Sequence, residues 1–231
     1  MIGREVRIIP LIGIPEIQAG DDLAGRLASA ASSADLADGD VVVVTHKVVS
    51  KAEGRIAAAD NKAHVVETES HHILRRTPGG MTISETRHGF VCANAGVDES
   101  NVPLGSIAML PVDPDASARR IRAKLANLTG ANVAVIISDT FGRAWRVGQT
   151  DVAIGVAGMS CFNDYRGTSD SEGRELHATR IAVADELAGA AELVMGKADG
   201  ICAAIIRGAR VESGRGAASE LVRPPGEDLF R

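Results

Sequence analysis

Three short segments of the sequence concentrate side chains that could bind anions or metal ions. The first, residues 45–55, supplies four potential cations and two hydroxyl groups directly after an apolar run. Ligands of α/β proteins gather beyond the carboxyl ends of strands, and Lys51 could meet a phosphate there as a point charge. A solvated basic loop would show the same composition, because runs of charge have low specificity.

The second segment, residues 87–101, is rich in oxygen ligands in its second half. Two amides and two carboxylates fall within eight positions, and Asp98 is a candidate metal ligand among them. Hard cations such as Mg²⁺ and Mn²⁺ prefer carboxylate and carbonyl oxygen. Residues of these types also form Asx-turns and helix caps very often, so a structural role explains the segment equally well.

The third segment, residues 138–146, begins where a hydrophobic strand is expected to end. Asp139 and Thr140 follow that strand, which is a usual place for a magnesium ligand in phosphoryl chemistry. Arg143 and Arg146 lie three positions apart beside the single tryptophan and could clamp a phosphate or a carboxylate. The alternative is an aspartate that caps the next element, followed by two surface arginines.

Several common site types are absent from the sequence. Gly196-Lys197 is followed by Ala198 rather than by a hydroxyl residue, so there is no Walker A motif, and there is no GxGxxG either. A serine hydrolase has little support without Gly-x-Ser-x-Gly. The net charge of −5 and the aromatic content of 3% argue against a nucleic-acid surface. The apolar runs are also shorter than the roughly 18 residues of a membrane span.

Cysteine usage predicts a reducing compartment. Three cysteines stand far apart without CxxC spacing, which supports neither a disulfide framework nor a zinc site. The first twenty residues contain no sustained apolar stretch of the kind found in a signal peptide. We therefore expect a cytoplasmic protein.

The elements that must position the polar segments form a mixed α/β pattern. Buried strands are predicted at residues 40–45, 133–138 and 202–206, because each is a continuous apolar run. Helices are predicted after an Asp21 or Asp22 cap, at about residues 115–128 with Gly130 as the stop, and at about residues 178–191. The order and pairing of the strands are not readable.

The chain is interpreted as one domain of 231 residues, with a division into two lobes left open. Residues 75–80 are a candidate linker. Residues 163–173 are polar, rich in glycine and too patterned for a plain linker, so we expect a functional loop there. Residues from about 217 to 231 are predicted to be a surface tail.

Eight ordered segments together resemble the coenzyme F420-0:L-glutamate ligase family. They are residues 13–17, 20–23, 49–54, 87–101, 138–146, 150–155, 164–167 and 195–200. Each motif alone is modest, but eight in register are highly specific, and they cover the chain from about residue 10 to residue 208. The resemblance is to the stand-alone ligase form, without the nitroreductase-like second domain of some actinobacterial relatives.

The resemblance implies an enzyme that joins L-glutamate by a γ-glutamyl amide bond to coenzyme F420-0, a phospholactyl deazaflavin. GTP is the implied co-substrate, an acyl phosphate the implied intermediate, and Mg²⁺ or Mn²⁺ the implied metal, with K⁺ as a further candidate ion. The implied fold is an uncommon α/β arrangement that forms intertwined homodimers. The expected partners are these small molecules and a second copy of the chain, with no nucleic acid and no membrane.

The resemblance also assigns roles to individual residues. The residues that would hold the nucleotide are Leu11, Ile12, Gly13, Ile14, His46, Lys47, Lys51, Asn101, Met195, Gly196, Lys197 and Ala198. Asp98 and Asp139 would bind one metal ion, and Thr140 would help to bind another. The residues expected to take part in catalysis are Asp98, Asp139, Lys51 and Arg143.

One residue departs from the pattern of this family. Some relatives carry glutamine where this chain has Lys197, and lysine has no oxygen to offer a metal ion. Whether a second metal binds there is left open by the sequence. Three other readings also stay open: a ligase of the same fold for another acid or amino acid, a nucleotide-binding module without catalysis, and a small hydrolase. Both Asp98 and Asp139 argue against the pure binding module, because binding alone needs fewer carboxylates.

Overall fold

The computed structural model describes residues 5–228. Its centre is a five-stranded sheet in the order β1-β12-β2-β8-β9, in which β2 and β8 are parallel and the other neighbours antiparallel. The strands are β1 (Arg7–Pro10), β12 (Ala203–Arg207), β2 (Val41–Thr45), β8 (Ala134–Arg143) and β9 (Arg146–Ala157). The expected mixture of α and β elements and the three predicted strands are therefore confirmed.

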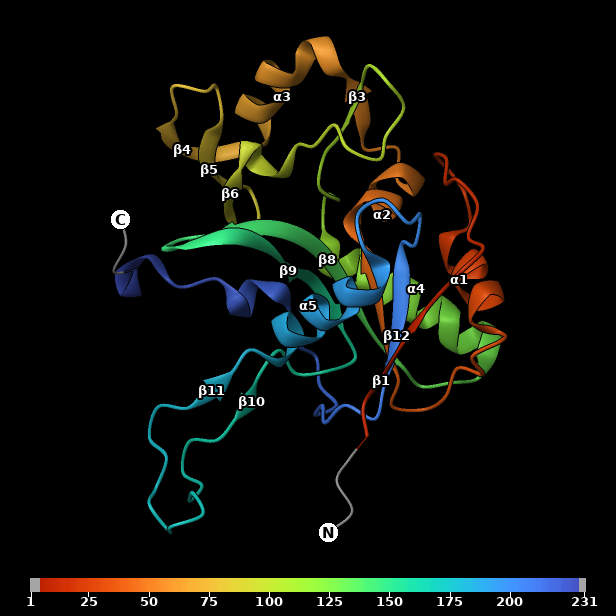
Figure 1. Ribbon diagram of the computed structural model, residues 1–231, viewed down its shortest axis with the longest axis vertical. Coiled ribbons are helices and arrows are strands. Elements are labelled where there is room, and N and C mark those ends of the chain that lie inside the picture. The colour runs from red at the N-terminus through yellow and green to blue at the C-terminus, as the bar shows by residue number, and fades with distance from the viewer. Residues whose placement is uncertain (1–4, 229–231) are drawn as a thin grey trace.

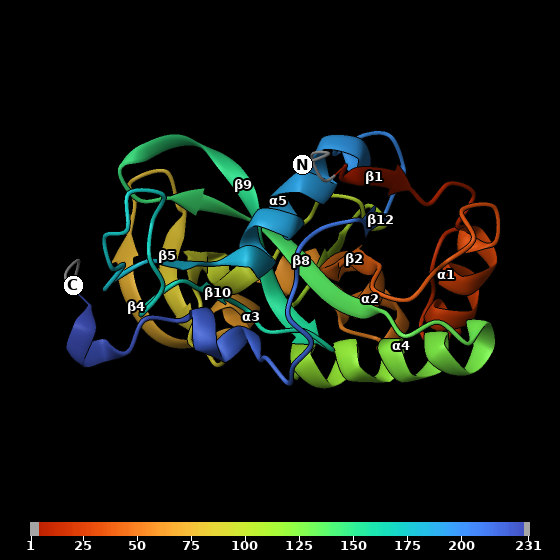
Figure 2. The ribbon, with the colours of Figure 1, turned by 90° about the horizontal axis from the view of Figure 1, so that it is seen from below.

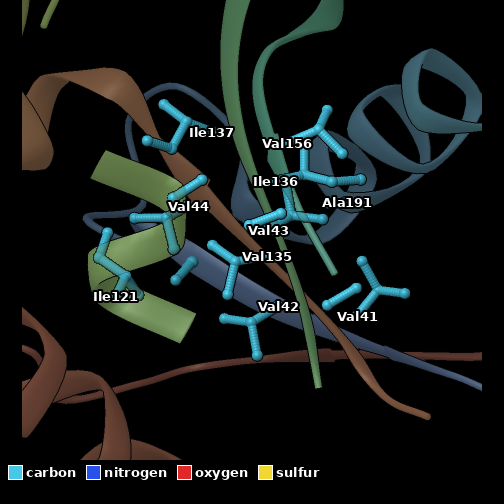
Figure 3. Packing of buried hydrophobic residues seen from close by; sticks show 14 of the residues in the cluster. Val41, Val42, Val43, Val44, Ile121, Val135, Ile136, Ile137, Val156 and Ala191 are labelled. Carbon is cyan, nitrogen blue, oxygen red and sulfur yellow. The ribbon is translucent and has the colours of Figure 1, made fainter. Parts of the chain in front are cut away.

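Helices cover both faces of this sheet (Figure 2). Helix α4 (Pro114–Thr129) packs on one face beside α1 (Leu23–Ala31), and α5 (Val183–Met195) packs on the other. Figure 3 shows the result: Ile121 of α4 and Ala191 of α5 lie on opposite sides of the central strands. Successive strand residues point to alternate faces, so a run of β-branched residues fills both layers of the core.

The ends of the first two long helices follow the local signals. Asp22 accepts a hydrogen bond from the Gly25 amide at the start of α1, and Asp113 accepts one from the Ala116 amide at the start of α4. Gly130 ends α4 in the left-handed conformation, with φ of 76°. The predictions for these two helices are confirmed.

The third helix was placed too early. Residues 178–182 are not helical, because Arg180 and Ile181 form the short strand β11 (Arg180–Ile181), which pairs with β10 (Asn163–Asp164). Helix α5 begins only at Val183 and continues to Met195. Residues between β10 and β11 form an arm that extends away from the body (Figure 1). The functional role expected for residues 163–173 stays a prediction.

A smaller lobe lies beyond one end of the central sheet (Figure 1). It contains the elements β3 (Ile56–Ala58), α3 (Lys62–Glu69), β4 (Ser70–Arg76), β5 (Thr82–Thr86), β6 (Val91–Ala93) and β7 (Ser106–Ala108). Its own apolar cluster is built around Val66, Val97 and Ile107. The prediction of a linker at residues 75–80 is wrong, because these residues form the end of β4 and the turn that leads into β5, closed by hydrogen bonds between Thr77 and Met81.

The prediction of a surface tail also needs correction. Residues 217–222 are not a surface tail: Ala218 is 1% exposed, and its amide donates to Asp115. Gly216 makes this packing possible, since a Cβ there would lie 2.5 Å from the Met159 carbonyl oxygen. The last three residues of the predicted tail, 229–231, lie outside the described residues.

Within residues 5–228, no helix has both the length and the apolar character to cross a bilayer.

Candidate functional site

The first polar segment folds as a helix rather than as a loop. Strand β2 ends at Thr45, and α2 (His46–Ala52) begins at the next residue. Lys51 lies in this helix, is 7% exposed, and donates a hydrogen bond to Glu16. A solvated loop was the alternative that the composition left open, but residues 46–52 form a helix whose last turn is held against Glu16 by Lys51. Lys51 is therefore fixed in place rather than solvated.

The first two residues of α2 contact Asp98 and Asp139, which are far apart in sequence. The Lys47 amino group lies 2.7 Å from Asp98 Oδ2, and His46 Nε2 lies 3.2 Å from Asp139 Oδ1. The His46 contact has the distance of an ion pair but not the direction of a hydrogen bond. Two acids that could bind a metal therefore contact adjacent residues at one helix end.

Asp98 is held in its charged form. Its carboxylate accepts hydrogen bonds from the Ser100 amide at 3.0 Å and the Ser100 hydroxyl at 2.7 Å, besides the contact with Lys47. Burial raises the pKa of Asp98, but the hydrogen bonds from Lys47 and Ser100 outweigh it and hold that pKa well below its usual range. The site therefore presents an ionised carboxylate at neutral pH. The interaction between Asp98 and Ser100 is also the Asx-turn that the sequence left as an alternative.

Asp139 and Thr140 lie inside a strand, which corrects their placement after its end. Strand β8 continues to Arg143, because residues 139–143 pair with β9 in a long hairpin. This register sets Thr140 directly opposite Asp151. Side chains that leave the two strands on the same face can then share hydrogen bonds.

Asp151 is a site residue to which the sequence assigned no role. It is 4% exposed and accepts hydrogen bonds from Thr140 at 2.5 Å and from Ser138 at 3.0 Å. The Lys197 amino group lies 3.1 Å from Asp151 Oδ1 and also contacts Thr140. The available signal was an acid directly before the apolar run of residues 152–157, since a buried charge is rare unless it is paired.

A cavity of about 420 Å³ opens between α2, the end of α5 and the small lobe. Its lining includes the polar residues Glu16, Thr45, Lys47, Lys51, Asn101, Asp151, Glu192, Lys197 and Cys202. Three lysines and three acids therefore line one cavity, and each of the three lysine amino groups contacts a carboxylate of Glu16, Asp98 or Asp151. Burial raises the pKa of the Cys202 thiol to about 11, so this cysteine is protonated at neutral pH and is not an activated nucleophile.

Comparison with known proteins then decides the family. The model of the F420-0:gamma-glutamyl ligase family matches residues 11–208. The chain belongs to this family. A protein from Methanothermobacter thermautotrophicus named coenzyme F420:L-glutamate ligase is 45% identical to it over 251 aligned residues, which cover 98% of this chain and 99% of the relative. Relatives of the same name from Methanopyrus kandleri and Methanocaldococcus jannaschii are 43% and 40% identical, with coverage of 98% or more of each chain.

The cavity of this gamma-glutamyl ligase family member gathers about half of the residues expected to hold a nucleotide. Those in its lining are Lys47, Lys51, Asn101, Met195, Gly196 and Lys197. Those outside its lining are Leu11, Ile12, Gly13, Ile14, His46 and Ala198. Leu11 and His46 are buried at 2% and 1% exposure, whereas Ile12 is 71% exposed. The segment 11–14 therefore has no contact with the cavity here, and its expected role stays a prediction.

Arg143 does not reach the cavity of the ligase. Its guanidinium donates a hydrogen bond to the Val147 carbonyl and stabilises the turn between β8 and β9. It is exposed, as is Arg146. The structure thus favours the alternative of two surface arginines over a phosphate clamp, and a catalytic role for Arg143 stays a prediction.

The donor set fits a metal ion that a nucleotide brings with it. Residues 5–228 contain no group of three or more histidine, cysteine or acidic side chains placed to enclose a metal. Asp98, Asp139 and Thr140 supply two carboxylates and one hydroxyl, but none of the three is in the cavity lining. Asp98 contacts the lining residue Lys47, Thr140 contacts the lining residues Asp151 and Lys197, and Asp139 contacts His46. Mg²⁺ typically binds through one or two carboxylates together with substrate phosphates and water. Such a sparse, oxygen-only set suits that kind of ion and not a closed structural site.

Proposed function

We propose that this ligase joins L-glutamate to coenzyme F420-0 through a γ-glutamyl amide bond, with GTP as the co-substrate and Mg²⁺ or Mn²⁺ as the metal. The observation that carries the proposal is the cavity in which Lys47, Lys51 and Lys197 converge beside Asp98. Several lysines around one space suit a polyphosphate, whose charges they neutralise. The substrate assignment is supported by relatives of 40–45% identity that are named coenzyme F420:L-glutamate ligase.

The chemistry explains why the reaction needs a nucleotide. A carboxylate is a poor acyl donor, because its leaving group would be oxide. In the proposed first step, the terminal phosphoryl group of GTP moves to a carboxylate oxygen of the acceptor and GDP leaves. In the second step, the glutamate amine attacks the acyl carbon, the bond to phosphate breaks, and the amine loses a proton. Both steps bring several anions close together.

The residues of the cavity match this requirement. Lys51 is buried and already paired with Glu16, which is largely exposed and can turn away when a phosphate takes its place. Lys47 keeps Asp98 ionised, as a metal ligand must be. Asp98 and Asp139 would hold one divalent ion, with K⁺ as a further candidate. A second ion at Thr140 is not part of the proposal, because the Lys197 amino group already contacts the Thr140 hydroxyl. Bound by the two carboxylates, the metal would neutralise charge on the transferred phosphoryl group.

Product analysis tests the proposed function. Purified protein is incubated with the deazaflavin acceptor, glutamate, GTP and Mn²⁺, and the acceptor mass is measured by mass spectrometry. We expect a gain of glutamate units that disappears when GTP or the metal is omitted. Equal GTP consumption with and without acceptor, and no glutamylated product, would point to a hydrolase. A product with another amino acid in place of glutamate would point to a ligase of the same fold with different specificity.

A further inference from the structure

The buried carboxylate of Asp151 has a positively charged partner from a distant loop. Both oxygens of Asp151 accept hydrogen bonds: Oδ2 from Ser138 and Oδ1 from Thr140. Among the described residues, the cation that contacts this carboxylate is Lys197, whose amino group lies 3.1 Å from Oδ1. A buried charge is costly unless it is paired and hydrogen-bonded. The Lys197 ammonium therefore compensates the charge of the buried Asp151 carboxylate.

The same oxygens form a typical ligand set for a hard metal ion. A carboxylate and a hydroxyl on neighbouring strands are oxygen donors of the kind that Mg²⁺ and Mn²⁺ select. The Lys197 amino group contacts both the Asp151 carboxylate and the Thr140 hydroxyl, so it lies where a cation bound by this pair would lie. An ammonium group has three donors and no acceptor. It can satisfy the pair but cannot itself bind a metal.

The main chain of Lys197 is anchored as well. Its carbonyl accepts a hydrogen bond from the Asn101 side chain at 3.3 Å, and the preceding Gly196 amide donates to Glu192 at the end of α5. Gly196 has φ of 58°, and a Cβ there would lie 2.6 Å from an Asp199 oxygen. Residues 195–200, here named the closing loop, are thus held by Asn101 and by Asp151, and four of them line the cavity.

We propose that the Lys197 ammonium is the built-in cation of the Thr140–Asp151 pair. The ammonium takes the position that a divalent ion would have there, and it keeps the closing loop in place. The inference builds on the proposed function only in taking the cavity to be a nucleotide and metal site. Lys197 acts as a positioning residue: two of its N–H groups hold Thr140 and Asp151, and its side chain also lines the cavity. The wild type then binds no divalent ion at this pair, and replacing Lys197 by an uncharged oxygen donor creates a site.

Counting bound Mn²⁺ tests this inference without any turnover. Mn²⁺ bound per chain is measured by electron paramagnetic resonance of the free ion, with and without a non-hydrolysable GTP analogue. We expect Lys197→Gln to bind one Mn²⁺ more than the wild type, because glutamine removes the ammonium and adds an oxygen. Lys197→Arg, which keeps the cation, should match the wild type. The double variant Lys197→Gln with Asp151→Asn should lose the additional ion.

The inference is overturned if the folded wild type and Lys197→Gln bind the same number of Mn²⁺ ions per chain. It is also overturned if the wild type binds an ion that the substitution Asp151→Asn removes. Hydrogen exchange of residues 195–200 provides a second measurement if the double variant does not fold. Without metal, this loop should exchange faster in Lys197→Gln than in the wild type or Lys197→Arg, and Mn²⁺ should reverse the difference. Unchanged exchange would also reject the proposal. Because neither readout needs product, failure to glutamylate F420-0 would leave this test intact.

Discussion

Lys47 Nζ lies 2.7 Å from Asp98 Oδ2 and thereby ties the first turn of α2 to the segment that precedes β7. The neighbouring His46 makes the corresponding contact with Asp139 on β8. Asp98 comes from the small lobe and Asp139 from the central sheet, so α2, which lines the cavity through Lys47, contacts both parts of the molecule. A ligand bound between these carboxylates would contact both parts of the molecule.

Replacing either carboxylate should remove most of the activity. We expect Asp98→Asn and Asp139→Asn each to lower turnover at least about 100-fold, since changes even in residues that only support metal ligands cost 10–100-fold. Thermal melts with and without Mn²⁺ check the reason, because both variants should lose the metal-induced stabilisation of the wild type. Glu67→Gln is a matched control, since Glu67 forms an exposed ion pair with Arg76 in the small lobe. If both variants kept the full Mn²⁺-induced shift in melting temperature, the assignment of one ion shared by Asp98 and Asp139 would be wrong.

Asp98 should also make stability depend on pH. Its pKa is depressed in the folded state, so its contribution is fully present above the unfolded value of about 3.9 and is lost as pH falls through the folded pKa. Denaturant unfolding of the wild type and Asp98→Asn should therefore give a constant difference from about pH 7 to pH 5 that shrinks at lower pH. Because the Asp98 side chain is 44% exposed, we expect no more than about 1 kcal/mol. A difference that grows on acidification would contradict this account.

Removing the buried lysine of α2 should weaken the use of GTP without unfolding the protein. A charged hydrogen bond is worth about 1.5–3 kcal/mol, so Lys51→Ala should raise the Michaelis constant for GTP about tenfold or more. Its partner Glu16 is largely exposed and can be solvated after the substitution. Lys124→Ala is the matched control, because Lys124 pairs with Asp22 on the outer helices. An unchanged Michaelis constant for GTP in Lys51→Ala would show that this lysine does not contact the nucleotide.

We expect the ligase to be a homodimer in solution, as its family resemblance implies. The turn between β8 and β9 carries Trp145 and Val147, which are 82% and 98% exposed. Large apolar side chains gathered on one projection favour a contact surface. Light scattering at micromolar concentration should give twice the mass of the chain, and Val147→Asp should weaken the association. Leu128→Asp, on exposed α4, is the control that should leave it unchanged. A monomeric wild type would contradict the prediction.

Local sequence signals predicted much of the framework. The runs Val41–Val44 and 134–137 are apolar at every position and rich in β-branched residues, which favours a strand covered on both faces, and both runs are buried. Asp22 and Gly130 marked helix ends through hydrogen bonding and backbone conformation that depend on a few neighbouring residues. The helix before Met195 was misplaced because Arg180 and Ile181 pair with a strand that no local signal announces.

The amino-acid sequence by itself determined the α/β class, the buried strands and the chemistry that Lys51, Asp98 and Asp139 could perform. Only the tertiary structure decided that Asp151 belongs to the site and that Lys197, 46 residues further along the chain, is its counterion. It also placed Lys51 in a helix and residues 217–222 against the core. Caps and apolar runs arise from contacts between near neighbours, so the sequence displays them directly. Contacts across the cavity depend on strand order, register and loop closure, which arise only when the whole chain packs.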